Sequence, residues 1–230
     1  MAFRWLSRGA ALGDPEGQNN LGSMFVNGQG CRRDSNRGIA WYRESAEQGL
    51  DIAQYNLAKR YYGGDGIEQD YGEARGWFEK AAVQGDAWAS CELGTMHRFG
   101  QGVPRNLLAA AEFHLIAAEA GDEVAILGNI AEYRAELEEM ALSGSQMASL
   151  LPSRIYNRGF GVEGSQPMTW AWISCAKKYG VSDVYPTTEE EVAEAYDFYQ
   201  MGISSESRKE GQRRLTAMRS AHAKLRKAER

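Results

Sequence analysis

A repeat of constant length constrains this chain more than any other feature of its sequence. Gly13, Gly49, Gly85 and Gly121 follow one another at intervals of 36 residues. Between these glycines, each unit reads as one helix, a glycine-rich turn and a second helix. A fixed period of this size is typical of a solenoid, because a single helix pair cannot bury its apolar face and must stack on its neighbours. The sequence therefore predicts an all-α fold, an α/α superhelical solenoid.

Each recurring position has a physical reason. Small residues in the first helix let two helix backbones approach closely, and large aromatic residues in the second helix fill the space between neighbouring pairs. A polar residue before the second helix can accept hydrogen bonds from the free amide groups at the helix start. The closing glycine of each unit suits the left-handed conformation that ends many helices. The small, aromatic and capping sets are, in that order, Gly22, Ala58 and Gly94; Trp41, Trp77 and Phe113; and Asp34, Asp70 and Asn106.

The pattern of the central unit resembles the Sel1-like repeat family. The resemblance is strong over residues 2–121, weaker up to residue 180 and absent from 181–230. It implies an α/α superhelix related to tetratricopeptide arrays, a bacterial type of array whose usual role is protein–protein interaction. The tetratricopeptide period of about 34 residues fits less well than the constant spacing found here. The residues that carry the resemblance are Ala53, Leu57, Tyr61, Gly64, Gly66, Asp70, Ala74, Trp77, Phe78, Ala81, Ala82 and Gly85.

The repeat pattern predicts four parts, with about four helix-turn-helix repeats in all. Residues 1–13 align with the second helix of a unit, so that either this helix caps the array or the natural chain extends further. Three regular repeats occupy 14–121, and a divergent helix followed by a degenerate repeat occupies 122–180. A C-terminal helical extension over 181–230 is expected to cap the array.

The last helix of this extension, from about Ser205, is strongly basic. From residue 205 to the end there are nine Lys or Arg residues against three Glu. Leu215, Met218, Ala221 and Leu225 lie on one apolar stripe. Nucleic-acid or membrane binding would need interleaved aromatic residues or a wider apolar face, so we predict a solvated amphipathic capping helix.

Composition excludes several classes of partner and location. The net charge of −5 and the pI near 5.4 argue against nucleic-acid binding, and no apolar run is long enough to span a membrane. The three cysteines cannot all pair, and the two cysteines per repeat of some secreted family members are absent. We therefore predict a reducing, cytoplasmic location, although a signal peptide removed before residue 1 would leave the same sequence.

No catalytic, cofactor or metal site is evident. His97 and His114 take the places of Tyr61 and Phe78 in the repeat, so both are expected to replace core aromatic residues. No pair of histidines has the spacing of metal ligands. Cys91 occupies a variable helix position and is expected to be exposed. We predict that the protein is not an enzyme and uses no cofactor.

The variable face of the first helices is the candidate binding surface. At about 100° per residue, Tyr55, Lys59 and Tyr62 lie opposite the core positions of the central unit. Trp88 and Arg98 lie on the same face in the next unit. If the first helices line an inner curve, these five side chains form a groove with the aromatic and Arg composition of interface hot spots. The alternative is that some of them pack against the next unit or the C-terminal helices.

These observations leave three functional hypotheses. The first is a non-enzymatic adaptor or scaffold that binds a protein or peptide in the groove. The second is a structural protein that self-associates through its terminal helices. The third and least favoured is an enzyme with a polar pocket within 122–200, where the repeat pattern decays.

Overall fold

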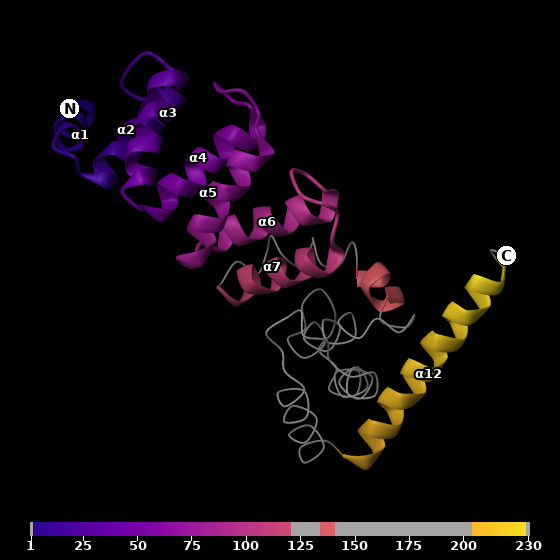
Figure 1. Cartoon of the computed structure of the whole chain (residues 1–230). Coiled ribbons are helices and arrows are strands. Elements are labelled where there is room, and N and C mark those ends of the chain that lie inside the picture. Colours follow the sequence, from indigo (N-terminus) through magenta and orange to yellow (C-terminus); the bar gives the residue numbers. More distant parts are fainter. Residues whose placement is uncertain (1, 121–133, 141–203, 229–230) are drawn as a thin grey trace. The chain divides into compact units, whose positions relative to one another are not determined.

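The computed structural model describes residues 2–120, 134–140 and 204–228 (Figure 1). The chain divides into two compact units, Met1–Asp122 and Glu123–Arg230, which are described separately. The described residues form helices and turns and contain no strand, so the predicted all-α fold is confirmed. The helices of the first unit are α1 (Ala2–Ala11), α2 (Pro15–Asn27), α3 (Ser35–Glu47), α4 (Asp51–Gly63), α5 (Tyr71–Val83), α6 (Ala87–Phe99) and α7 (Leu107–Glu119).

The seven helices of the first unit stack in the order of the sequence. Each helix packs mainly on the helix before it and the helix after it. The hairpins α2–α3, α4–α5 and α6–α7 follow one another through the unit, and α1 lies beside α2 at the N-terminal end (Figure 1). This is the predicted solenoid of helix pairs, and α1 stands in the place of a second helix.

The second helix of each pair begins at a side-chain cap, as the repeat predicts. Asp34 accepts a hydrogen bond from the backbone N–H of Arg37 at 3.1 Å. Asp70 accepts from the N–H groups of the second and third residues after it, at 2.8 and 3.0 Å. Asn106 makes the same two bonds at 3.1 Å each. The first helices end at Gly28, Gly64 and Gly100, which all adopt the left-handed conformation with φ near 70°.

We expect Asp70→Ala to lower the free energy of unfolding by about 1 kcal/mol, because it removes the acceptor for two amide groups at the start of α5. Asp70→Asn keeps an acceptor and should remain close to wild type. Urea denaturation followed by circular dichroism measures both. Equal losses in the two variants would show that the cap is not the cause.

Close helix contact explains the small residues at the recurring positions. In α3, a Cβ atom added to Gly38 would lie 2.5 Å from Cγ2 of Val26 and 2.8 Å from the carbonyl oxygen of Gly22 in α2. The equivalent positions of α4 and α5 are Ala58 and Ala74, which are fully buried. The first pair of helices therefore leaves no room for even one methyl group where the second pair holds two.

The hydrophobic core runs from unit to unit rather than forming a centre within each. One cluster joins Val26 and Ile39 of the first pair to Ala53 and Leu57 of the second. The next cluster, around Phe78, extends from α4 to α6. The predicted aromatic fillers Trp41, Trp77 and Phe113 are partly buried against these clusters or the N-terminal one. The spacing prediction for these residues is therefore confirmed.

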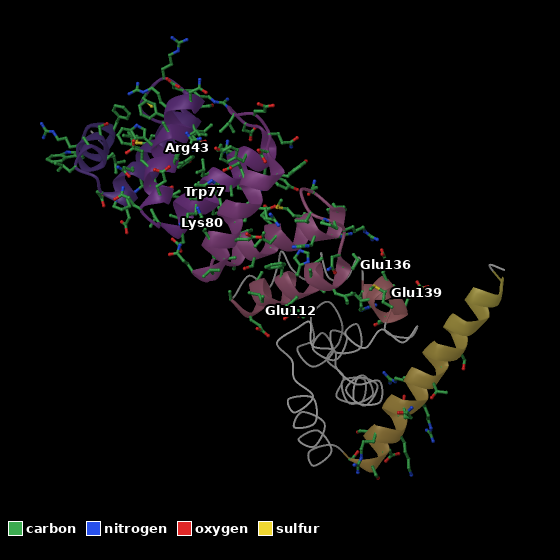
Figure 2. The ribbon with its side chains drawn as sticks, in the orientation of Figure 1. Arg43, Trp77, Lys80, Glu112, Glu136 and Glu139 are labelled. Carbon is green, nitrogen blue, oxygen red and sulfur yellow. The ribbon has the colours of Figure 1, made fainter. Side chains whose placement is uncertain are left out.

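The ring of Trp77, which is partly exposed, makes a cation–π contact with Lys80. The Lys80 ammonium lies 3.7 Å from the centroid of the Trp77 ring, one turn along the same side of α5 (Figure 2). Nearby, the Arg43 guanidinium of α3 donates to the Tyr61 hydroxyl of α4 at 2.9 Å. The bond between Arg43 and Tyr61 links two consecutive helix pairs at the edge of the core.

Buried glutamines join successive units in a repeated hydrogen-bonded pattern. Gln18 and Gln54 are 3% and 5% exposed, and each donates to a backbone carbonyl near the end of the preceding second helix. Gln48 then donates to the side-chain oxygen of Gln18 at 2.6 Å, and Gln84 donates to that of Gln54 at 2.9 Å. Because a buried amide must find partners, this pattern fixes how one unit sits on the next.

The described part of the second unit consists of helical residues 134–140 and helix α12 (Ser205–Ala228). The predicted helix at 122–141 is thus helical where it is described, and the start of the basic last helix is where the sequence placed it. The Ser204 hydroxyl accepts from the N–H of Ser207 at 3.1 Å at the start of α12. The predicted degenerate repeat within 144–180 and the side chains of the apolar stripe lie outside the described residues.

Candidate functional site

An open groove of about 770 Å³ runs across the N-terminal parts of α2, α4 and α6. The helical period explains which side chains of α4 reach it. Ala53 and Leu57 are fully buried in the core, whereas Ile52, Tyr55 and Asn56 emerge on the other side and line the groove. The first helices of three consecutive units therefore build one continuous surface.

The apolar part of the groove is formed by Leu50, Ile52, Tyr55 and Trp88. Ile52 and Trp88 are 49% and 55% exposed, which is high for large apolar side chains. Tyr55 is half-buried, and its ring lies 5.8 Å from that of Phe78 in the core. The core thus holds Tyr55 in place beneath a patch that water still reaches.

The charged part of the groove is entirely acidic. Its lining contains Glu16, Asp51 and Asp86 and no Lys, Arg or His residue. Burial raises the pKa of the Asp86 carboxyl, and the nearby Asp51 carboxylate raises it further, against the lowering effect of the hydrogen bond from the N–H of Ala89. The carboxylates are therefore close enough to repel one another, and a cation placed in the groove would relieve that repulsion.

Amide side chains complete the lining. The Asn56 side chain of α4 donates to the Asn19 oxygen of α2 at 2.9 Å. Asn20 also lines the groove and is exposed. These groups can donate to or accept from a peptide backbone, which the aromatic side chains beside them cannot do alone.

Of the five residues predicted for partner binding, Tyr55 and Trp88 come together in this groove. Lys59 instead forms a 2.6 Å ion pair with Glu92 of α6. The Tyr62 hydroxyl donates to Gln101 at 2.7 Å, in the turn after α6. These two side chains contact the next unit, as the alternative interpretation of the sequence allowed.

Arg98, the fifth residue, lies near the other end of α6. Its guanidinium is 4.8 Å from the centroid of the neighbouring Phe99 ring, and it does not line the groove. Arg98 therefore belongs to the same array of first helices but not to the cavity that holds Tyr55 and Trp88.

Sequence reasoning missed the acidic residues of the groove. A usable signal existed for Asp86, because it occupies the position of Asp14 two units earlier and both side chains cap a first helix. The expected exposure of Cys91 is wrong, since this side chain is only 8% exposed. Residues that vary between units are thus divided between the groove and the packing of α6.

The two histidines predicted to replace core aromatic residues lie in the array as expected. His114 is fully buried and hydrogen-bonds the backbone of Cys91, and burial lowers its pKa to about 4. His97 stacks on Phe113 with ring centroids 5.4 Å apart, and burial lowers its pKa as well. Within residues 2–120, 134–140 and 204–228, no group of His, Cys, Asp and Glu could hold a metal ion.

Among the helices that the structure describes, none is long and apolar enough to cross a membrane.

Helix pairs that repeat every 36 residues and share one continuous core define an α/α repeat protein. The family model of the Sel1 repeat matches residues 1–14, 15–50, 51–86 and 89–122. The chain therefore belongs to the Sel1 repeat family, whose members are commonly protein–protein interaction scaffolds.

Two solved structures illustrate the similarity. One is c5321, a protective antigen of uropathogenic Escherichia coli strains displaying an SLR fold, with 25% identity and a TM-score of 0.55; the match covers 86% of this chain and 48% of that protein. The chain thus spans about half the length of c5321. The other is a Sel1 repeat protein from Oxalobacter formigenes, with 35% identity and a TM-score of 0.48 over 52% of this chain and 90% of that one. No curated protein matches the sequence.

Proposed function

We propose that this chain is a non-catalytic scaffold that binds a segment of a partner protein in the groove across α2, α4 and α6. The observation that supports it best is the exposed apolar patch of Ile52, Tyr55 and Trp88 within an open groove. Large aromatic side chains in a partly enclosed site are typical of interface hot spots. The acidic and amide groups around the patch provide a polar rim.

The proposed surface continues beyond the groove along the same helices. Lys59, Tyr62 and Arg98 are partly exposed on α4 and α6 and would contact a partner that extends past Tyr55 and Trp88. In this proposal the three repeats of 14–121 form the binding part. A cytoplasmic location is part of the proposal, and the free thiols of Cys31 and Cys91 are compatible with it.

The test is capture of partners from a lysate of the source organism by immobilised protein. Tyr55→Ala/Trp88→Ala is expected to weaken binding by about 1,000-fold, because each truncation at an aromatic hot spot costs about 2 kcal/mol and the pair therefore about 4 kcal/mol. Trp88→Ala alone should give a smaller loss without disturbing the contact of Tyr55 with Phe78.

A matched control replaces two large exposed side chains outside the groove, Trp5 and Leu12, which are 68% and 88% exposed. Trp5→Ala/Leu12→Ala should capture the same protein as wild type, and circular dichroism should confirm that all variants stay helical. A partner held equally by wild type and by the groove variant would place the binding site elsewhere.

A further inference from the structure

We propose that the groove accepts helix α12 of a second copy of this chain, so that the protein self-associates through two different surfaces. This inference rests on the proposed function, because it names an occupant for the same groove. It is carried by complementary charge on two surfaces of the chain and by the exposed apolar patch between the charges.

The groove supplies three carboxylates without a cation. Glu16, Asp51 and Asp86 form no ion pair in the described part of the chain, and no basic residue lines the groove beside them. Asp86 and Asp51 accept backbone hydrogen bonds at the N-terminal ends of α6 and α4, which fixes their position at the edge. Three negative charges in one open groove, two of them held in place, favour a basic occupant.

Helix α12 supplies the opposite charge. Over Ser205–Ala228 it contains eight Lys or Arg residues and two Glu residues. Arg214 forms an ion pair with Glu210 at 2.8 Å. Lys209 and Arg213 are exposed, lie one turn apart on the same face, and have no carboxylate partner among the described residues. A helix face with two such cations is suited to an acidic groove.

The small residues on α12 and the length of this helix also fit the groove. Next to Lys209 and Arg213, α12 presents the small residues Thr216, Ala217 and Ser220 around a shallow hollow. A face of small residues lets large side chains approach closely, and the groove presents Tyr55 and Trp88. At 24 residues, α12 is about 36 Å long, which is enough to lie across several helices about 10 Å wide.

Because the groove and α12 are different surfaces, the contact is heterologous. Each copy offers one of each, so two copies can close reciprocally or further copies can add. In both cases the average mass rises with concentration above the 25.5 kDa of one chain. High salt should reverse the rise, because the attraction depends on exposed charges.

The experiment is sedimentation velocity of the full chain over about a hundredfold range of concentration at low and high salt. The groove variant Glu16→Lys/Asp51→Lys and the helix variant Lys209→Glu/Arg213→Glu should each associate at least about tenfold more weakly than wild type. An equimolar mixture of the two should regain association, since the reversed charges again face opposite ones. The control Glu44→Lys/Glu47→Lys makes the same change in net charge on the exposed side of α3 and should behave as wild type.

Two outcomes overturn the inference: a wild-type chain of single-chain mass at every concentration, and association that survives both charge reversals. The proposed function is rejected by a different result, namely a partner protein that Tyr55→Ala/Trp88→Ala retains as well as wild type does. A single-chain mass together with groove-dependent capture would therefore reject the second copy and keep the scaffold.

Discussion

Gly38→Ala should destabilise the array by about 2 to 3 kcal/mol, since overpacking a close contact forces backbones apart. The added Cβ would lie 2.8 Å from the carbonyl oxygen of Gly22 and 2.5 Å from Val26. The valine side chain can rotate, but the carbonyl belongs to the backbone of α2. The two helices must therefore separate, which weakens the packing between them.

Gly76→Ala is the matched control for this prediction. Gly76 lies within α5, and a Cβ added there meets nothing within 4 Å. Alanine is favoured over glycine in a helix interior by about 0.5 to 1 kcal/mol, so this variant should be more stable than wild type. Urea denaturation of both proteins measures the difference. If both changes stabilise the protein, the close contact of α2 and α3 is not rigid.

The second large effect is a loss of stability in acid that depends on His114. The native pKa of this residue is about 4 against an ordinary value of 6.5, because burial disfavours the charged ring. Between pH 6.5 and pH 4 the unfolded chain binds the proton and the native chain does not. The free energy of unfolding should therefore fall as the pH falls through this window, by about 3 kcal/mol in total. Above pH 7 this residue contributes no dependence on pH.

His114→Phe should remove most of this dependence. The aligned residue of the preceding unit is Phe78, so an aromatic ring without a titrating group suits the position. The variant loses the hydrogen bond to the backbone of Cys91, which lowers stability equally at all pH values. Urea midpoints at several pH values between 4 and 7.5 test the prediction. An unchanged slope in His114→Phe would assign the acid sensitivity to other groups, such as His97.

The sequence by itself determined the repeat unit. The caps at Asp34 and Asp70 and the left-handed glycines at Gly28 and Gly64 could be predicted because each satisfies backbone groups only a few residues away. Burial of Leu57 and Phe78 followed from the helical period and from the recurrence of apolar residues at 36 residues. These are local requirements, so they are written into local sequence.

The tertiary structure decided how the variable positions are used. Lys59 and Tyr62 share a helix face with Tyr55, yet they contact Glu92 and Gln101 of the next unit while Tyr55 lines the groove. Which neighbour a side chain meets depends on the rotation between units, and the buried glutamines contribute to setting that rotation. The position of a residue within the repeat does not determine this rotation.

The distance between helices likewise decides which residue fits at position 38. Its counterparts Ala74 and Ala110 suggest from the sequence that alanine fits at this position. Only the structure shows that Gly22 lies opposite and brings the helices too close for a methyl group. The sequence thus determines what each unit is, whereas the distance and rotation between helices determine its surface, because they arise from contacts between residues far apart in the chain.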